Sequence, residues 1–336
     1  MIVTEPRRVA ALSLAHFLAA RLGQKVGHEV GFQVRFERWP GTRLTFMTPG
    51  VFLAHLRMRR EIPGVDVVVV DEFHERDALT DAVLALLREQ RRQGRLRVVV
   101  MSATLEASRV ASYLDAIHID FGASSVRESP DGEVLNNGRY EVHILYRPNA
   151  DLPQILREIS EKEEKKDPRF PGGGTLVFLP GKREIEEAAR QVRAAWPEAV
   201  ILPLHSECSE EEIRAALNPP QGRRWVVLAT NVAETSLTIP DVRYVVDTGV
   251  EKVQVWDPRT GAGSLRPVPI SRSSAAQRAG RAGRTGPGVV FRMWSREDHA
   301  RRPEFRPPEI LREDLGHLTL QLLDMGIRPS SLEWLD

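Results

Sequence analysis

The sequence contains almost no cysteine and no apolar run of membrane length. Cys208 is the single cysteine among 336 residues, so neither an internal disulfide nor a metal site built from several cysteines can form. No apolar stretch reaches the roughly 18–20 residues that span a bilayer. Glu5, Arg7 and Arg8 stand where a signal peptide has its apolar segment. These absences predict a cytoplasmic protein with no structural metal and no membrane partner.

Lysine is also scarce, and a motif that depends on lysine is missing. The chain has six lysines, none followed by serine or threonine: Lys25, Lys162, Lys165, Lys166, Lys182 and Lys252. The phosphate-binding loop Gly-x-x-x-x-Gly-Lys-Ser/Thr holds nucleotide phosphates with its backbone N–H groups and its lysine. The sequence does not contain this loop.

Positive charge is unevenly distributed along the chain. The formal net charge of +1 does not by itself indicate a nucleic-acid partner. Between Arg266 and Arg306, however, ten arginines stand against only Glu297, Asp298 and Glu304, a local balance of +7. Such a run is either a solvated surface or a site for phosphate groups.

What is present predicts a globular α/β protein. Apolar residues make up 42% and charged residues 28%, which is typical of globular chains. Continuous apolar runs separated by amphipathic segments predict parallel sheets in α/β layers. The expected strands are 67–70, 98–101, 176–179, 226–228 and 242–246, and the expected helices are 9–22, 79–89, 183–196 and 210–217.

The chain divides most easily near its middle. Residues 161–167 are a charged run, and residues 168–174 are rich in proline and glycine. We therefore predict two α/β domains, 1–147 and 148–300, each within the usual size range. Prolines interrupt the pattern after residue 300, so residues 301–336 are expected to begin a third, helical region.

Two acids follow the most apolar strand. Residues 67–70 are four valines, and Asp71 and Glu72 come next. The carboxyl ends of parallel strands form the binding crevice of such sheets. There Asp71 can bind Mg²⁺, Glu72 can orient or deprotonate a water, and His74 can sense a nucleotide. A strand end with solvated capping acids is the alternative.

Hydroxyl and amide side chains follow two further strands. Ser102 and Thr104 come after strand 98–101, and residues 229–239 extend strand 226–228 with Thr230, Asn231 and Ser236. Such groups suit contacts to phosphate oxygens and ribose. Ordinary helix caps and turns without a ligand would show the same pattern.

The octet at residues 277–284 lies within the arginine-rich run. Gln277, Arg281 and Arg284 fall at i, i+4 and i+7, which predicts a single helix face. Gly280 and Gly283 each cost a helix about 1 kcal/mol against alanine, which suggests that a close partner needs the room. Two arginines on one face can clamp phosphate charge. A solvated basic helix is the alternative.

The order and spacing of these segments resemble superfamily 2 helicases of the DEAH/RHA group, nearest to the bacterial HrpB-like branch. The resemblance covers nearly the whole chain. The segments similar to motifs Ia, Ib, II, III, IV, V and VI are 4–8, 48–50, 71–74, 102–104, 176–181, 229–239 and 277–284. Residues 253–270 look like the strand-separating β-hairpin of this group, and residues 308–315 also resemble the branch.

The resemblance implies a fold and a function. The fold would be α/β, with two RecA-like domains of the P-loop NTPase type in tandem and then the start of a winged-helix or helicase-associated region. The function would be an ATP-dependent RNA helicase that binds ATP and Mg²⁺ and acts on single-stranded RNA or a duplex with an overhang. Such enzymes are nucleoside-triphosphatases that couple hydrolysis to translocation and unwinding.

The resemblance also implies residue roles. The residues implied in catalysis are Asp71, Glu72, His74, Gln277, Arg281 and Arg284, with Asp71 and Glu72 at Mg²⁺. Those implied in nucleotide binding are Ser102, Thr104, Ser236 and Asp241. Those implied in gripping the RNA backbone are Arg8, Thr48, Ser206, Thr230 and Asn231. RNA contacts of this kind are blind to sequence and sensitive to salt.

The sequence departs from the group in the missing phosphate-binding loop. The group carries it on a central strand before motif Ia, which here begins at Thr4. We therefore expect Met1 to be an internal methionine, the first domain to lack that strand, and ATP hydrolysis by these 336 residues to be impaired. Pro49 and Val250 are smaller departures, replacing an acid and an aromatic residue.

Two other functions remain open at this point. A relative without the loop could bind RNA without hydrolysing ATP. A related motor could act on duplex DNA. Retention of Asp71, Glu72, Arg281 and Arg284 favours hydrolysis, because a simple binding module has no chemical need for them.

Overall fold

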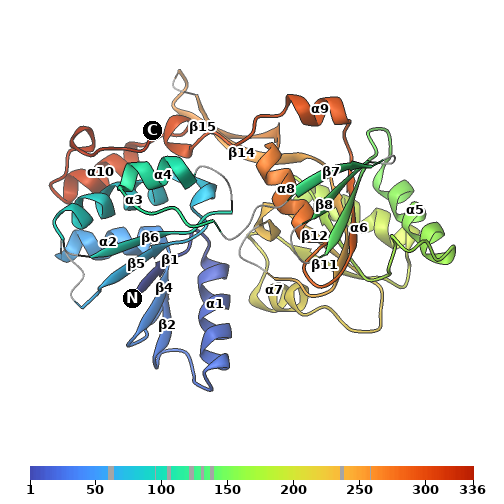
Figure 1. Ribbon diagram of the computed structural model, residues 1–336, viewed down its shortest axis with the longest axis horizontal. Helices are drawn as coiled ribbons and strands as arrows, with labels where there is room; N and C mark the ends of the chain where they lie inside the picture. The colour runs from blue at the N-terminus through green and yellow to red at the C-terminus, as the bar shows by residue number, and fades with distance from the viewer. Residues whose placement is uncertain are drawn as a thin grey trace. The chain divides into compact units, whose positions relative to one another are not determined.

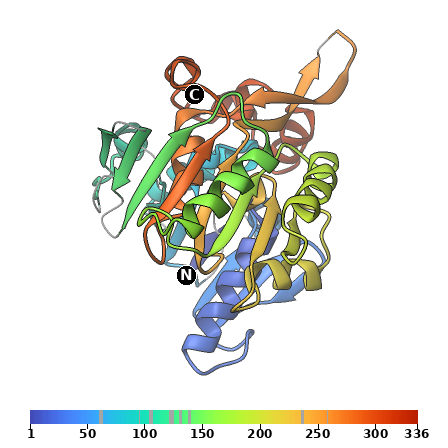
Figure 2. The same ribbon diagram turned by 90° about the vertical axis from the view of Figure 1, so that its right-hand side faces the viewer.

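The chain folds into two compact units. The computed structural model describes residues 1–59, 64–94, 96–103, 107–120, 125–129, 132–136, 140–234, 238–257 and 259–336. The first unit comprises residues 1–119, 255–263 and 307–336, and the second comprises residues 120–254 and 264–306. Figures 1 and 2 show a separate sheet in each unit. Within the described ranges no helix combines the length and apolarity needed to cross a bilayer.

The first unit is built on a mainly parallel sheet of six strands in the order β3-β2-β4-β1-β5-β6. Among the described strands of this sheet, β3 pairs antiparallel with β2, and the other pairs are parallel. The strands are β1 (Ile2–Thr4), β2 (Val30–Val34), β3 (Glu37–Trp39), β4 (Leu44–Met47), β5 (Val67–Val70) and β6 (Arg97–Val100). Because helices cover both faces, a strand such as β5 can consist entirely of valine.

Helices cover the two faces of this sheet unequally. The small residues Ala11, Ala15 and Ala19 bring α1 against one face. Helices α2, α3, α4 and α10 share a core with Val68 and Val70 on the opposite face. The helices are α1 (Arg8–Arg21), α2 (Pro49–Arg59), η1 (Phe73–Glu75), α3 (Ala78–Arg92), α4 (Ala107–Leu114), η3 (Glu309–Leu311), α10 (Gly316–Asp324) and η4 (Pro329–Ser331). In Figure 1 the red α10 lies beside α3 and α4, although some 200 residues separate them in sequence.

The second unit has a larger sheet of eight strands in the order β11-β12-β10-β13-β16-β9-β8-β7. The strands from β11 to β9 are parallel, and β8 and β7 are added antiparallel. Their bounds are β7 (Ser125–Ser129), β8 (Gly132–Asn136), β9 (Glu141–Tyr146), β10 (Gly174–Phe178), β11 (Val200–Leu204), β12 (Trp225–Ala229), β13 (Val242–Asp247) and β16 (Gly288–Arg292).

Alternate residues of these strands face two different layers. Val177, Val226 and Val246 share a core with α5 and α6, which lie in front of the sheet in Figure 2. Phe178 and Asp247 face the other layer, where they contact Arg278 of α8. The helices are α5 (Leu152–Glu164), α6 (Lys182–Ala195), α7 (Glu210–Leu217), η2 (Asn231–Ala233), α8 (Arg272–Gly280) and α9 (Arg296–Arg301).

The predicted α/β class, strands and helices are confirmed, but the domain boundary differs. The first boundary lies after Ile119 rather than at 147, because residues 125–146 form β7, β8 and β9, and β9 pairs with β16. Residues 307–336 pack in the first unit. Their assignment to the start of a winged-helix region stays a prediction.

Two further features are the expected hairpin and an exposed strand of the first sheet. The expected hairpin is present as β14 (Val250–Asp257) and β15 (Ala262–Pro269), a separate two-stranded sheet. In the first unit, β6 is the last strand of the described sheet, and Val99 and Met101 are 44% and 42% exposed. Apolar surface is therefore open to solvent along β6.

Candidate active site

The carboxyl edge of the first sheet collects several of the predicted residues. Strands β4, β1, β5 and β6 are neighbours and run parallel. Thr48 follows β4, Glu5 follows β1, Asp71 follows β5 and Ser102 follows β6. Ser102 is exposed. Thr104 lies outside the described residues.

The turn after β5 presents two carboxylates at this edge. The Asp71 N–H donates to the Thr4 carbonyl at 3.0 Å, which continues the pairing of β1 and β5. Asp71 Oδ1 accepts from the N–H of Glu72 at 2.8 Å, and Glu72 has the left-handed φ of 49°. Phe73 is buried and donates its N–H to the Met101 carbonyl. This anchor ties the turn to β6 and leaves Asp71 and Glu72 at the surface of the edge.

His74 links the turn to the segment after β6. The N–H of Ala103 donates to His74 Nδ1 at 3.3 Å, which assigns the ring proton to Nε2. Nε2 is buried and has no hydrogen-bond partner among the described residues. Glu72 Oε2 lies 3.5 Å from Nδ1. His74 therefore connects the predicted motif II and motif III segments directly.

A third acid, Glu5, is buried beside Asp71. Glu5 is fully buried. Burial, followed by the neighbouring Asp71 carboxylate, raises the pKa of Glu5 to about 10. Burial likewise raises the pKa of Asp71. Burial therefore favours the protonated form of Glu5, whose carboxyl group can share a proton with Asp71.

The carboxylates at this edge suit a cation that is only partly enclosed by protein. No group of three or more His, Cys, Asp or Glu side chains forms a metal cage within the described ranges. Mg²⁺ usually takes one or two carboxylates and completes its shell with water and phosphate oxygens. Asp71 and Glu72 are a donor set of that kind.

The two residues predicted to bind RNA in the first unit, Arg8 and Thr48, lie at helix starts. Arg8 begins α1, and its guanidinium lies 3.6 Å from Glu37. Thr48 precedes α2, and its carbonyl accepts from Phe52 N–H. Arg7 instead pairs with Glu75 at 3.0 Å, so this neighbour of Arg8 holds the motif II turn.

The second unit brings its own predicted residues to one edge. Ser206 lies two residues beyond the end of β11, and Thr230 and Asn231 follow β12. The two strands pair in register from Val200 to Leu204, and Thr230 N–H donates to the Leu204 carbonyl. The hydroxyl and amide groups of Ser206, Thr230 and Asn231 therefore lie along the carboxyl edge of one sheet. Ser236 lies outside the described residues.

The octet does not form one continuous helix. Helix α8 ends at Gly280, and Arg284 lies in a bend beyond it. The prediction of a single face through i+7 is therefore wrong for Arg284. The N–H groups of Arg281 and Ala282 donate to carbonyls three residues back, which tightens the chain at the helix end.

The three predicted residues of the octet differ in their hydrogen bonds. The Arg281 guanidinium is bonded to the Glu234 carbonyl, and Arg281 is 6% exposed. Arg284 Nη1 donates to Thr238 Oγ1 at 2.9 Å, and both arginines line one small cavity. Gln277 Oε1 is buried and has no partner among the described residues. Arg281 and Arg284 are therefore brought together.

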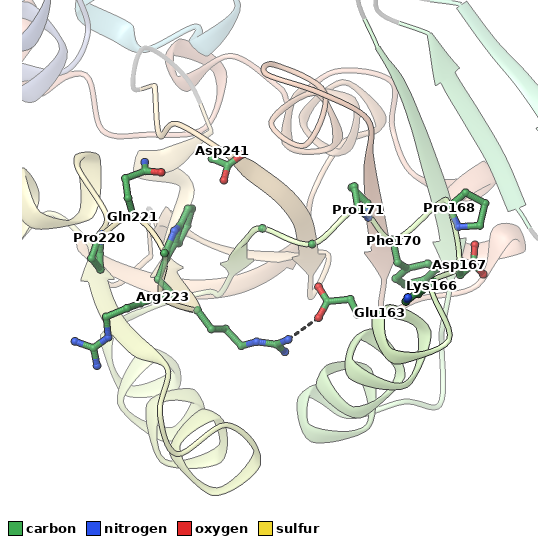
Figure 3. A pocket seen from close by; sticks show the side chains of 15 residues that line it. Glu163, Lys166, Asp167, Pro168, Phe170, Pro171, Pro220, Gln221, Arg223 and Asp241 are labelled. Carbon is green, nitrogen blue, oxygen red and sulfur yellow. Dashed lines mark hydrogen bonds and ion pairs between the residues drawn. The ribbon is translucent and has the colours of Figure 1, made fainter.

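Asp241 lies in a different place from the octet. It precedes β13, and its carboxylate accepts from Arg243 Nε at 3.0 Å. It lines a cavity of about 690 Å³ at the amino ends of β10, β12 and β13, drawn in Figure 3 with Glu163 and Gln221. Neither Arg281 nor Arg284 lines that cavity. The next residue, Val242, lines the small cavity beside Arg281 and Arg284, so the assignment of Asp241 to the nucleotide stays a prediction.

The charges around this cavity largely neutralise one another. Glu163 pairs with Arg224, the contact dashed in Figure 3. Asp167 pairs with Arg169 at 2.9 Å, which holds the pKa of Asp167 at about 2. Lys166 and Arg223 add positive charge to the same lining.

Comparisons with known proteins match both units. The family model "DEAD/DEAH box helicase" matches residues 2–112, and "Helicase conserved C-terminal domain" matches residues 154–286. The chain is 38% identical to the ATP-dependent RNA helicase HrpB of Escherichia coli, over 100% of this chain and 41% of that protein. The crystal structure of E. coli DEAH/RHA helicase HrpB superposes with a TM-score of 0.84 at 34% identity, covering 100% of this chain and 42% of that one.

The chain belongs to the DEAH-box helicase family. It is also 33% identical to the ATP-dependent RNA helicase HrpA of Borreliella burgdorferi, over 97% of this chain and 39% of that protein. The chain spans about two fifths of the length of these relatives. The resemblance on which the sequence analysis relied is thus confirmed for the family and for its α/β fold.

Sequence reasoning missed a buried network in the second unit of this family member. Arg278 is 1% exposed and contacts Glu234 and Asp247, each at 2.9 Å. Ser274 Oγ donates to the other oxygen of Glu234 at 2.6 Å. Arg278 is i+4 from Ser274, on a helix side lined with small residues. Small residues around Arg278 in the sequence could have indicated that this arginine is buried. The spacing of Gln277, Arg281 and Arg284 indicated an arginine-finger site instead.

Proposed function

We propose that this chain forms the motor of an ATP-dependent RNA helicase, which couples ATP hydrolysis to movement along RNA and to unwinding. The observation that carries the proposal is the Asp71–Glu72 turn at the carboxyl edge of a parallel sheet. It is the position at which such sheets bind nucleotides. The relatives are named ATP-dependent RNA helicases, which supports the same assignment.

In this proposal Asp71 and Glu72 hold Mg²⁺ and the attacking water. These two carboxylates would hold the ion, which would supply positive charge beside the phosphates. Glu72 orients the water and accepts its proton. Glu5 keeps a proton beside Asp71 and limits the negative charge there. His74 connects this turn to Ala103, so it can report the state of the nucleotide to neighbouring segments.

The octet supplies the positive charge for the terminal phosphate. We assign Gln277, Arg281 and Arg284 to contacts with that phosphate, the role in which arginine fingers stabilise negative charge during transfer. Burial of Arg281 lowers the local dielectric constant, so its charge would interact more strongly with a phosphate than it would in bulk water. Ser102, Thr104 and Ser236 are assigned to nucleotide binding. Asp241 is kept as a weaker candidate, because it lines the separate cavity.

RNA would be held by its backbone in both units. Arg8 and Thr48 belong to the first unit, and Ser206, Thr230 and Asn231 belong to the second. One cation among hydroxyl and amide groups suits phosphate and ribose oxygens rather than base edges. The proposal therefore predicts binding without sequence preference.

The decisive experiment is RNA-stimulated ATP hydrolysis with Glu72→Gln. It is measured on the 336-residue chain and on the natural polypeptide that contains it, if that is longer. The variant should lose hydrolysis by about 100-fold or more, as expected for removal of a catalytic base. Glu89→Gln is the matched control, because it makes the same change at an exposed position of α3. RNA-independent hydrolysis unaffected by Glu72→Gln would refute the proposal.

RNA binding gives a second test that needs no hydrolysis. We expect the dissociation constant for a single-stranded RNA to rise with salt, and Arg8→Gln to reduce the log–log slope by about 0.7, one phosphate contact on a single strand. Arg190→Gln, an exposed position of α6, should leave the slope unchanged. Fluorescence anisotropy in about 50 to about 300 mM KCl, a range over which the Debye length shortens, measures the slope for both variants. Equal slopes for the two variants would remove Arg8 from the RNA site.

A further inference from the structure

The turn that carries Asp71 and Glu72 has an unusual backbone at both ends. Glu72 and Arg76 have φ of 49° and 50°. This left-handed conformation is uncommon for residues other than glycine. It persists only where surrounding contacts hold it. The question is therefore which contacts fix the turn from Asp71 to Asp77.

Arg76 is fixed by carboxylates from two distant parts of the chain. Its side chain is 5% exposed. It contacts both oxygens of Asp81, with Nε at 2.9 Å and Nη2 at 3.2 Å, and it also pairs with Asp336. The Phe73 ring lies 5.1 Å from its guanidinium carbon. One carboxylate comes from α3, and the other comes from the segment 307–336.

Glu309 of the same segment bonds the turn on both sides of Asp77. Its N–H donates to the Arg76 carbonyl at 3.0 Å, and its Oε2 accepts from the Ala78 N–H at 3.0 Å. Asp77 is the N-cap of α3 and accepts from the Thr80 N–H. The Ala78 N–H is one of the donors that the first turn of a helix leaves without a partner. Glu309 therefore completes the cap of α3 from 231 residues away.

The rest of the segment 307–336 packs firmly on the same unit. Leu318, Leu322 and Met325 belong to the core that contains Phe73. Trp334 packs against that core, and Glu333 bonds Arg92 at 2.9 Å. The bonds from Glu309 to the turn thus start from an anchored element.

We propose that the segment 307–336 is a brace that sets the position of the turn from Asp71 to Asp77, with Glu309 as its positioning residue. The inference rests on the proposed function, because the place of Asp71 and Glu72 matters to hydrolysis only if they hold the cation and the water. A partner or a conformational change that lifts the brace would lower hydrolysis without touching the nucleotide. The brace is therefore a point of control over the motif II turn.

Three variants at partly or fully exposed positions test the brace. Glu309→Ala removes the acceptor for the Ala78 N–H. Glu309→Gln keeps an oxygen in its place. Asp314→Ala is the matched control, because it removes an exposed carboxylate of the same segment whose bond is local, to the Gly316 N–H. Thermal unfolding of each variant confirms that it is folded.

Hydrogen exchange reads the turn without any activity. We expect amides of residues 71–81 to exchange at least about tenfold faster in Glu309→Ala. The turn opens more often when a contact that holds it closed is removed, and exchange follows that opening. Glu309→Gln and Asp314→Ala should match the unaltered chain. Unchanged exchange in Glu309→Ala overturns the brace.

Hydrolysis then tests positioning against a purely structural role. In the hydrolysing polypeptide that contains this chain, Glu309→Ala should lower kcat on the order of tenfold with KM for ATP nearly unchanged, because small misplacement of catalytic groups costs up to roughly a hundredfold. Glu309→Gln should restore kcat. An unchanged kcat, or a glutamine variant as impaired as alanine, overturns positioning. An unaltered polypeptide without hydrolysis refutes the proposed function instead, and exchange still decides the brace.

Discussion

At the scale of single residues, the second unit depends on one buried arginine. Arg278 lies between Glu234 and Asp247. The positive charge and hydrogen bonds of Arg278 hold the pKa of Glu234 below its usual range despite complete burial. Arg278 thus favours the anionic form of Glu234 inside the unit. Removing the cation leaves charges with no compensation, which the interior tolerates poorly.

We therefore expect Arg278→Met to destabilise the second unit by about 3–5 kcal/mol, the cost of breaking a buried ion pair on one side. Urea unfolding of the two proteins measures the difference. Arg190→Met is the control, because Arg190 is exposed on α6. Adding Glu234→Gln to Arg278→Met should recover part of the loss, since one uncompensated charge disappears. A loss no larger than that of the control would show that the network is not stabilising.

His299 predicts a pH dependence. Burial and the nearby arginines Arg292 and Arg302 lower the pKa of His299 from 6.5 to about 4. As pH falls from 6.5 to 4, the unfolded chain gains a proton at this histidine and the folded chain does not. This contribution to the unfolding free energy is therefore complete above pH 6.5 and is lost toward pH 4, by at most about 1.4 kcal/mol per pH unit.

His299→Gln isolates this effect. The variant cannot titrate at residue 299, so its unfolding free energy should fall less than that of the unaltered chain between pH 7 and pH 5. Urea unfolding at both values gives the comparison, with His118→Gln, an exposed position, as the control. Parallel losses in all three proteins would mean that His299 is protonated in the folded state.

Much of the candidate site could be predicted from residues in local sequence. Asp71 and Glu72 follow a strand whose four valines leave little doubt about its burial. Glu5 could not be predicted as their neighbour, because its contact depends on β1 pairing with β5 some 65 residues later. Asp241 was assigned to the nucleotide on its place after motif V, and the larger cavity that it lines at the start of β13 was not predicted. Pairing between distant segments was the missing information in both cases.

At the scale of elements, the four helices expected from periodicity are present as α1, α3, α6 and α7, but the antiparallel strands of the second sheet were not predicted. Helix α7 has the predicted bounds, Glu210–Leu217. Strands β7 and β8 were not predicted. They are added antiparallel beyond β9, and their pairing depends on contacts between strands rather than on a continuous apolar run. The helix of the octet was predicted too long, since glycine allows the chain to leave the helix at Gly280. Helix α5 was not predicted either, although it buries Leu152, Ile155 and Ile159 on one side.

Helix α5 offers a test of a local signal on its own. Asp151 and Gln154 form a capping box, each side chain bonded to the backbone N–H of the other at 2.8 Å. We expect Asp151→Ala to lower the unfolding free energy by about 1 kcal/mol, the usual cost of losing an N-cap. Glu161→Ala removes an exposed side chain from the same helix and should change it by less than about 0.5 kcal/mol. Equal effects would show that tertiary packing alone fixes the start of α5.

At the scale of the whole molecule, the two units have separate cores. The core of the first unit includes Phe73, Val83 and Leu322, with Trp334 packed against it. The core of the second unit includes Val177, Val226 and Trp196. The indole N–H of each tryptophan also donates a hydrogen bond of 2.9 Å. Trp334 donates to the Pro329 carbonyl, and Trp196 donates to Ser160 Oγ. The two residues therefore form a matched pair of probes.

We expect each tryptophan to stabilise its own unit. Trp334→Ala and Trp196→Ala should each cost about 3–5 kcal/mol, the range for truncating a packed tryptophan. In moderate urea, hydrogen exchange should accelerate at residues 83–87 in the first variant and at residues 226–228 in the second. Because the lost contacts lie within one core in each case, the opposite unit should keep its protection. If either variant accelerated exchange in both sets of residues equally, the chain would be a single cooperative unit, and the brace at 307–336 would then stabilise the whole motor rather than the motif II turn alone.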